Sequence, residues 1–431
     1  MSFVAKNITL KNIGIYMFST SINQAIPFLM LPILTIFLLP KDFGYINNFS
    51  AILVLSNAII GGGMTANIAK NYFTMDKIFM KKMMGNLYFF LSIVTIFAFL
   101  VVLIVNLFCN ITFIPPKLFI IIPFISFFFI SFEFLKETLK IRKQVGNYAL
   151  FTFSEMILNI SFSLILVVLL LWNWKGRVYS IIFSYLIFGI FSIIYFIKKD
   201  SIKFSIDINI LKKILNLSLP LLSSTISIMV MRKSGVLFID SFFGKTEAGL
   251  YGIALNISTI ILFISMPFIN IWMPYIYKKL ANKNQNTFLA LRSNLFLFTC
   301  LIFFASIVFS LISGSIIRIM TTEAFMPAKV FIPWLAFGFA LWALYSMYMP
   351  FFIHYGKQKF LSIITIVSAL SNILANFFLI SVIGAKGIAI SFFLSNFLTY
   401  ALVFISVRSF VKLPVFPDMK MMRLTIKGFV K

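Results

Sequence analysis

Twelve apolar runs, each long enough to cross a bilayer as an α-helix, constrain the fold of this chain more than any other feature. Backbone groups cannot stay unpaired in hydrocarbon, and the runs are too long and too continuously apolar for barrel strands. We therefore predict an all-α polytopic membrane protein with about 12 transmembrane helices. The runs lie at about 12–39, 46–68, 84–109, 118–135, 148–171, 178–197, 215–241, 250–273, 294–317, 330–353, 360–383 and 387–407.

Composition leaves no room for a sizeable soluble domain. Of 431 residues, 61% are hydrophobic and 11% charged, and the mean hydropathy is +1.04. The two cysteines, Cys109 and Cys300, lie in apolar runs, and His354 is the single histidine, so neither a disulfide framework nor a Cys or His metal site is expected. Without a catalytic constellation or a large loop to carry one, we expect a protein that is not an enzyme and needs no cofactor.

The basic residues predict the orientation of the chain. The formal net charge is +26, and placing the N-terminus inside puts 27 of the 37 Lys and Arg residues on the inner side. This bias follows the positive-inside rule, so both termini are predicted to be cytoplasmic. The charge is therefore expected to face anionic membrane lipids rather than nucleic acid.

Three sequence elements recur in order at offsets of 205 to 211 residues. An odd number of helices per copy would invert the second copy, whereas six helices keep both in the same orientation. We predict two six-helix lobes, 1–205 and 206–431, related by a parallel repeat, with a substrate cavity between them. The paired elements are Asp42-Phe43-Gly44 with Glu247-Ala248-Gly249, Pro123 with Pro333, and Lys175-Gly176-(Ser180, Ser184) with Lys386-Gly387-(Ser391, Ser395).

Two segments carry a resemblance to a known family. LKKILNLSLPLLSSTIS at 211–227 and DSFFGKTEAGLYGIALNIS at 240–258 resemble the start of the second lobe in Wzx-type O-unit flippases, which are polysaccharide transporters of the MOP superfamily. LLPKDFGYINNFSAI at 38–52 is similar to the matching element of the first lobe. The family pattern often has Asp followed by Arg near the outer end of the seventh helix, whereas this chain has Ser234-Gly235-Val236 there.

The resemblance implies a MATE-like fold and a function in surface-polysaccharide assembly. It implies a flippase of the bacterial inner membrane. The substrate would be an undecaprenyl-diphosphate-linked oligosaccharide, an O-antigen or capsule repeat unit, moved by alternating access from the cytoplasmic to the periplasmic leaflet. The polymerase and chain-length proteins of the same pathway are the protein partners that it implies.

Arg232 and Lys233 lie side by side within the predicted seventh helix. Each costs about 2.5–3.5 kcal/mol at the centre of a span, so lipid exposure is disfavoured. The pair could face a hydrated cavity and bind the diphosphate, with Arg232 as a bidentate fork and Lys233 as a point charge. Alternatively, Asp240 or an acid from another helix neutralises one cation, or the helix breaks at Ser234-Gly235.

Other polar residues within the spans are candidates for coupling and for sugar contacts. Glu155 could hold a coupling ion, Na⁺ or H⁺, or form an ion pair, as could Asp240, whereas Glu133 is expected to pair with Lys136. Asn23, Gln24 and Asn256 are the preferred sugar contacts, since the family's cavity is lined by early helices of both lobes.

Two other functions remain open. A MATE-like drug or cation antiporter has the same predicted fold, but its cavity would usually carry acids rather than an Arg-Lys pair. An integral-membrane polysaccharide polymerase would usually carry a large outer loop, and the predicted outer loops of this chain are short.

Overall fold

The computed structural model describes residues 28–72, 76–109, 111–199, 201–203, 205–281 and 285–411. Within these ranges every regular element is a helix, and ten helices are long and apolar enough to cross a membrane. One of the ten, Ile208–Leu280, contains two of the predicted spans. The predicted all-α polytopic fold is therefore confirmed. Most of the first predicted span lies outside the described residues, and its described end is the helix Phe28–Phe37.

The chain forms two compact units, Met1–Gly252 and Ile253–Lys431. The first unit takes in most of α8, whereas the sequence prediction divides the lobes before that helix. Unit 1 contains α2 (Pro40–Gly61), α3 (Met64–Asn71), α4 (Lys77–Phe108), α5 (Pro116–Ile141), α6 (Val145–Ser163), the π-helical turn Leu164–Leu169, α7 (Asn173–Lys198) and α8 (Ile208–Ser258) as far as Gly252. Unit 2 contains the end of α8, α9 (Ile260–Ala281), α10 (Gln285–Leu311), α11 (Ser313–Met320), the 3-10 helix Glu323–Val330, α12 (Ile332–His354), α13 (Gln358–Ile383) and α14 (Ala385–Phe410).

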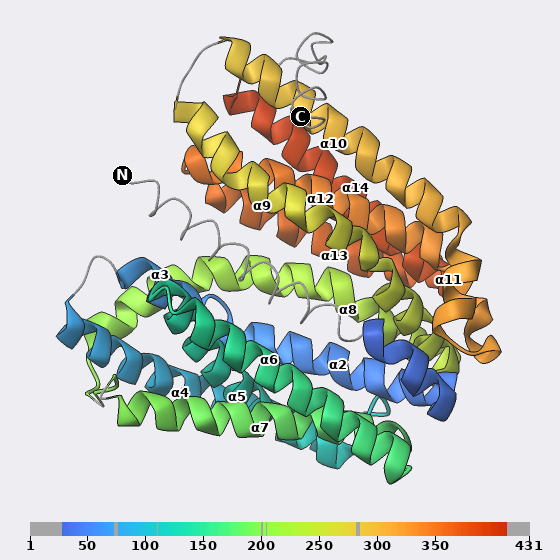
Figure 1. Cartoon of the computed structure of the whole chain (residues 1–431), viewed down its shortest axis with the longest axis horizontal. Helices are drawn as coiled ribbons and strands as arrows, with labels where there is room; N and C mark the ends of the chain where they lie inside the picture. Colours follow the sequence, from blue (N-terminus) through green and yellow to red (C-terminus); the bar gives the residue numbers. More distant parts are fainter. Residues whose placement is uncertain are drawn as a thin grey trace. The chain divides into compact units, whose positions relative to one another are not determined.

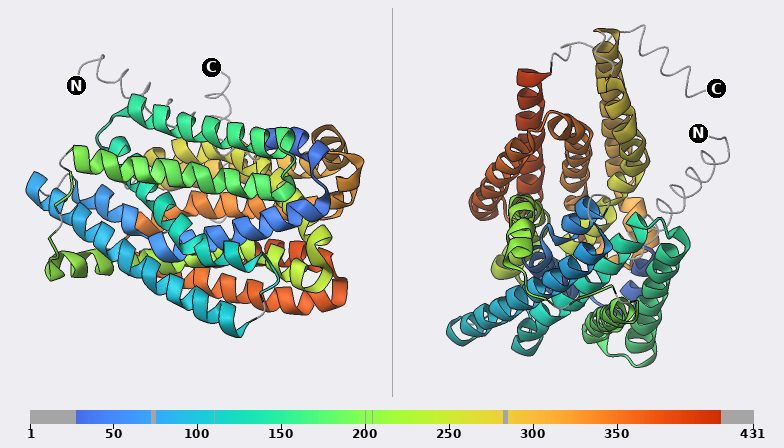
Figure 2. Two further views of the ribbon diagram at one scale, coloured as in Figure 1. Left: turned by 90° about the horizontal axis from the view of Figure 1, so that it is seen from below. Right: turned by 90° about the vertical axis from the view of Figure 1, so that its left-hand side faces the viewer.

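Helix α5 lies at the centre of unit 1. It packs against α2, α3, α4, α6 and α7, and Figures 1 and 2 show α2, α4 and α7 running alongside it. Phe134, Leu135 and Leu139 of α5 are fully buried and belong to one apolar cluster with Leu87 of α4 and Phe196 of α7. Each helix of the bundle is apolar on nearly every side, so its inner side packs into this cluster while its outer side stays apolar.

Helix α12 has the same central role in unit 2. It packs against α9, α10, α13 and α14, and Leu344, Phe351 and Phe352 on it are fully buried. The central helices α5 and α12 contain Pro123 and Pro333, one of the pairs from which the repeat was predicted.

The glycines of the other repeat elements also have matching roles. A Cβ on Gly176 of α7 would meet the backbone of Leu166, and one on Gly387 of α14 would meet the backbone of Leu379, so each glycine lets its helix approach the preceding segment. The serines that follow, Ser180 with Ser184 and Ser391 with Ser395, are buried in both units. These shared packing roles support the parallel repeat.

The Gly44 and Gly249 elements contact each other reciprocally. A Cβ on Gly44 would overlap the carbonyl of Lys245, and one on Gly249 would overlap the carbonyl of Pro40. Pro40 and Lys245 each lie four residues before their glycine, so the same pair of positions touches in both directions. Reciprocal contacts of this kind are the mark of a local two-fold axis.

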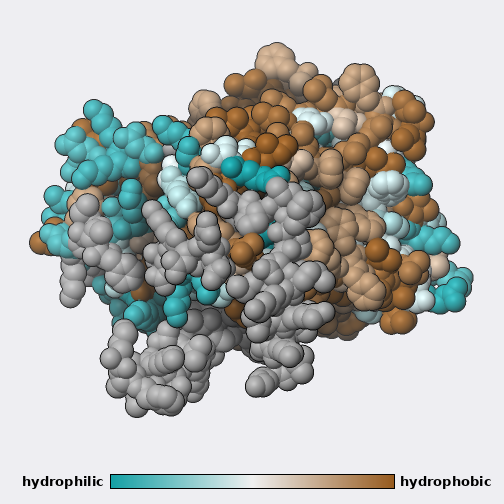
Figure 3. Space-filling model, turned by 90° about the horizontal axis from the view of Figure 1, so that it is seen from above, coloured by the Kyte–Doolittle hydropathy of each residue, from teal (hydrophilic) through white to brown (hydrophobic). Residues whose placement is uncertain are grey.

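The outer surface is largely apolar. Figure 3 shows hydrophobic side chains over much of one face, with hydrophilic residues gathered toward its ends. Exposed large side chains include Phe97 at 67%, Phe108 at 83% and Phe378 at 70%. Such exposure would be unstable in water and is expected for residues that contact lipid.

Candidate functional site

Helix α8 continues unbroken through Arg232 and Lys233. Its one non-helical residue is Gly244, with φ 80° and ψ −177°, and both Ser234 and Gly235 are helical and buried. The predicted alternative of a break at Ser234-Gly235 is therefore wrong, because the flexible glycine that ends this stretch of helix lies about 15 Å further along it. Arg232 and Lys233 are both half-buried.

Asp240 pairs with Lys245 rather than with Lys233. Lys233 and Asp240 are about 10 Å apart along the helix axis, and in the described part of the chain no ion pair joins Lys233 to an acid. The turn at Gly244 brings Lys245 back to Asp240, and the two form a salt bridge with side chains only 13% and 3% exposed. The ion pair that the sequence suggested for Asp240 exists, but its cation is a residue beyond the helix break.

The Asp240–Lys245 pair ties three elements together. Lys245 Nζ also donates to the carbonyl of Thr112, at 3.1 Å, in the connection before α5. It lies 5.2 Å from the ring centroid of Tyr45 in α2. Asp240 Oδ1 is buried and has no hydrogen-bond partner among the described residues. Lys245 therefore neutralises a buried carboxylate while linking α2, α8 and the α4–α5 connection.

We expect Lys245→Met to destabilise unit 1 by about 3–5 kcal/mol, because it leaves the Asp240 carboxylate buried without its cation. The double variant Asp240→Asn/Lys245→Met should be more stable than Lys245→Met, since no charge is then unpaired. Thermal unfolding of the purified variants in detergent measures both. Lys117→Met is the control, because Lys117 is an exposed lysine at the same end of the unit. Equal melting temperatures for the single and double variants would contradict the pairing.

A second group of charges lies between α5, α6 and α7. Glu133 and Lys136 of α5 form a salt bridge, as predicted. Glu155 of α6 is 8% exposed and interacts electrostatically with Lys136 and with Arg177 of α7. Two carboxylates are thus matched by two cations inside the bundle, so Glu155 lies in a charge-balanced environment.

Arg177 is the residue of this group that sequence reasoning missed, since its position near the start of a span placed it with the outer-loop cations. Its Nη1 donates to Asn159 Oδ1 at 2.6 Å and to Ser180 Oγ at 3.2 Å. The Arg177–Asn159 bond joins α7 to α6. The available signal was the four-residue spacing of Glu155 and Asn159, which puts both on one face of α6.

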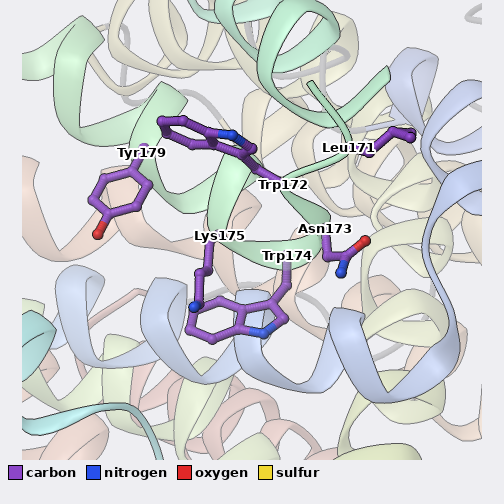
Figure 4. Close-up of a pocket in the computed structure, with 6 residues that line it drawn as sticks. All are labelled: Leu171, Trp172, Asn173, Trp174, Lys175 and Tyr179. Carbon is purple, nitrogen blue, oxygen red and sulfur yellow. The ribbon is translucent and has the colours of Figure 1, made fainter. Parts of the chain in front are cut away.

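The connection from α6 to α7 lines an open cavity of about 560 Å³. Figure 4 shows the indole of Trp172 beside the ring of Tyr179, with Trp174 and Lys175 lying below them. The lining residues are Leu171, Trp172, Asn173, Trp174, Lys175 and Tyr179. Sequence analysis did not single out this group, although two tryptophans two residues apart were visible in a chain that has five.

Of the three predicted sugar contacts, the structure describes Asn256. Asn23 and Gln24 lie outside the described residues. Asn256 is half-buried in the part of α8 that belongs to unit 2, and its carbonyl accepts a hydrogen bond of 2.6 Å from Thr259 Oγ1.

Comparison with known proteins relates the chain by sequence to a polysaccharide biosynthesis family and by fold to several solved transporters. The polysaccharide biosynthesis protein family matches residues 9–280. A search of curated protein sequences found no significant match.

Solved structures show the same fold at low sequence identity. The lipid II flippase MurJ in an inward closed conformation has a TM-score of 0.72 and 14% identity over 98% of this chain and 91% of its own. An inward-facing multidrug resistance MATE family transporter has a TM-score of 0.68 and 17% identity, covering 90% and 94%. A MOP superfamily transporter from Pyrococcus furiosus has a TM-score of 0.57 and 15% identity, covering 93% and 95%.

Proposed function

Because the chain belongs to the polysaccharide biosynthesis protein family, we propose that it moves a lipid-linked oligosaccharide across the membrane. The proposed substrate is an undecaprenyl-diphosphate-linked repeat unit of O-antigen or capsule, carried from the cytoplasmic to the periplasmic leaflet. The fold that it shares with a lipid II flippase supports a lipid-linked substrate. The largely apolar surface and the helix lengths make it a multi-pass membrane protein.

The observation that carries this proposal is the Arg232–Lys233 pair in α8. A diphosphate cannot cross hydrocarbon unaided, because a bare charge costs tens of kcal/mol there in ideal solvation estimates. Two adjacent half-buried cations deep in a spanning helix offer a fork and a point charge for phosphate oxygens. The lipid tail can stay in the bilayer while the headgroup and sugars pass along the protein in alternating access.

The membrane potential favours this direction of transport. An inside-negative potential contributes about 2.3 kcal/mol per charge per 100 mV to outward movement of an anion, so no nucleotide is needed in principle.

Coupling to inward Na⁺ or H⁺ at Glu155 stays part of the proposal. The neighbouring Lys136 and Arg177 oppose both ions, because a proton or Na⁺ would add positive charge to a group that is already charge-balanced.

The proposed location is the bacterial inner membrane with both termini in the cytoplasm, as the distribution of Lys and Arg predicts. Anionic lipids would then face the basic inner loops. The polymerase and chain-length proteins of the pathway are the proposed protein partners. A MATE-like antiporter has less support, because the half-buried Glu133 of α5 and the buried Glu155 of α6 lie beside cations rather than in a free acidic site.

Deletion of the gene tests the proposal. We expect cells without the protein to accumulate lipid-linked oligosaccharide on the cytoplasmic leaflet and to lose surface polysaccharide. Thin-layer chromatography of extracted lipid-linked saccharide measures its accumulation. A glycan-oxidising reagent that cannot cross the membrane then shows which leaflet holds the saccharide, because it modifies only the sugars on the side to which it is added. Unchanged levels of the intermediate, together with increased sensitivity to cationic drugs, would favour the antiporter instead.

A further inference from the structure

Aromatic rings surround the cavity at the α6–α7 connection, and some of them are held in place by neighbouring rings. Trp174 stacks on Tyr45 of α2, with ring centroids 4.6 Å apart and planes 16° from parallel. Trp172 meets Tyr179 edge-on at 6.1 Å, and 47% of Trp172 is exposed. One aromatic ring is therefore held in place from behind, while another presents much of its surface to the cavity (Figure 4).

The backbone at this cavity adopts conformations that cost energy. Leu171 and Asn173 have φ of 53° and 49°, in the left-handed region that side chains rarely occupy. The π-helical turn Leu164–Leu169 lies directly before them, and Leu166 accepts a bond of 2.9 Å from the amide of Trp172. Strained residues and π-helical turns are enriched at functional sites, where they aim particular side chains.

The cavity lies at the end of unit 1 that is predicted to face outward. Tyr45 links it to the start of α2, and Lys245, near Tyr45, reaches Thr112 before α5. All these connections are outer loops in the predicted topology. The predicted inner connections gather elsewhere, where Asn86 Nδ2 donates to the carbonyl of Ser205 at 2.8 Å.

The residues of the cavity suit one face and the rim of a sugar ring. A pyranose has a face of C–H bonds that packs against an aromatic ring, and hydroxyl groups at its edge. Trp172, Trp174 and Tyr179 supply rings, whereas Asn173 can donate and accept hydrogen bonds and Lys175 can donate. About 560 Å³ is within the usual size of a small-molecule pocket.

We propose that this aromatic cavity binds a sugar unit of the translocated oligosaccharide on the outer side of the membrane, before the saccharide is released. The inference rests on the proposed flippase function, and it adds a second binding site, distinct from the Arg232–Lys233 pair. The basic Lys175 favours saccharides that carry an acidic group or a dense rim of hydroxyls.

Membrane anchoring is the alternative role for tryptophans at this level of a bilayer. Interfacial tryptophans and tyrosines sit at the level of the lipid headgroups and need no cavity beside them. A cavity, a stacked ring behind it and two left-handed residues favour a ligand over an anchor.

Calorimetric titration of the purified full-length protein in detergent tests the site. The probe is the mixture of oligosaccharides released by mild acid from the host's own lipid-linked saccharides. We expect the wild-type protein to bind, and Trp172→Ala to bind about tenfold more weakly, as at other sites where rings stack on ligands. Trp172→Phe should keep the affinity within about twofold, because it keeps a ring. Trp334→Ala in α12 is the matched control and should bind like the wild type.

Three results would overturn the inference. They are absence of binding by the wild-type protein, equal affinity of Trp172→Ala, and a Trp172→Ala protein whose only defect is lower abundance in the membrane, which would indicate anchoring. Failure of the proposed function is a different observation. If deletion leaves lipid-linked saccharide unchanged, the flippase itself is wrong; if the intermediate accumulates but the wild-type protein binds no oligosaccharide, only this site falls.

Discussion

Alanine at Arg232 or at Lys233 should reduce export of the lipid-linked oligosaccharide by about tenfold to a hundredfold. Hydrogen bonds to charged groups contribute about 1.5–3 kcal/mol each, and the diphosphate would lose one such partner. Arg232→Lys should recover only part of the rate, because Lys lacks the bidentate fork. The readout is intermediate retained on the inner leaflet, normalised to the amount of each protein in the membrane.

Lys212→Ala is the matched control for these variants. Lys212 is an exposed lysine on the same helix, near its start, so its loss removes a charge without touching the half-buried pair. If both alanine variants export normally at normal abundance, the Arg232–Lys233 pair does not bind the diphosphate during transport. A defect in Lys212→Ala of the same size would point to bulk charge rather than to the pair.

A side chain at Gly249 should strongly destabilise the fold. Even Gly249→Ala places a Cβ into the carbonyl of Pro40 and near the backbone of Gly44, where no flexible side chain can move aside. Overpacking typically costs about 1–3 kcal/mol of stability. Because this Cβ would clash with the backbone of both Pro40 and Gly44, we expect a loss of at least about 3 kcal/mol. Thermal unfolding in detergent and the amount of protein in the membrane measure the loss.

Gly146→Ala provides the comparison, because a Cβ there meets nothing within 4 Å. That variant should be as stable as the wild type or slightly more stable, since Ala favours the helix. Gly44→Ala should resemble Gly249→Ala, because the two glycines face each other's element across the local two-fold axis. If only one of the two were sensitive, the contact would not be reciprocal.

The Asp240–Lys245 pair illustrates why the candidate site was only partly predictable. Sequence spacing measures separation along one helix, and by that measure Lys233 was the neighbour of Asp240. The φ of Gly244 changes the direction of the chain, and Lys245 returns to the acid from beyond the turn. The φ angle of Gly244 therefore determines which lysine pairs with Asp240. A glycine in the sequence allows such an angle but does not show that the chain adopts it.

The aromatic cavity could not be predicted from the sequence either, although its tryptophans are visible there. Trp172 and Trp174 are visible in the sequence, yet the stacking of Trp174 on Tyr45 depends on α2 and α7 meeting at one end of the bundle. No local pattern records a contact between residues more than a hundred positions apart. Arg177 was likewise assigned to an outer loop, because its inward bond to Asn159 needs α6 and α7 to be packed together.

The sequence alone determined the helical class and the spans, and it predicts the orientation and the repeat, because each depends on one-dimensional properties. Hydrocarbon requires about 20 apolar residues with paired backbone groups, and this requirement is legible in any stretch of chain. Only the tertiary structure decided which charges pair, which glycines let backbones touch and which rings line the cavity. Those depend on distances between segments far apart in the chain, and in a core made mostly of apolar side chains, composition does not encode which of them meet.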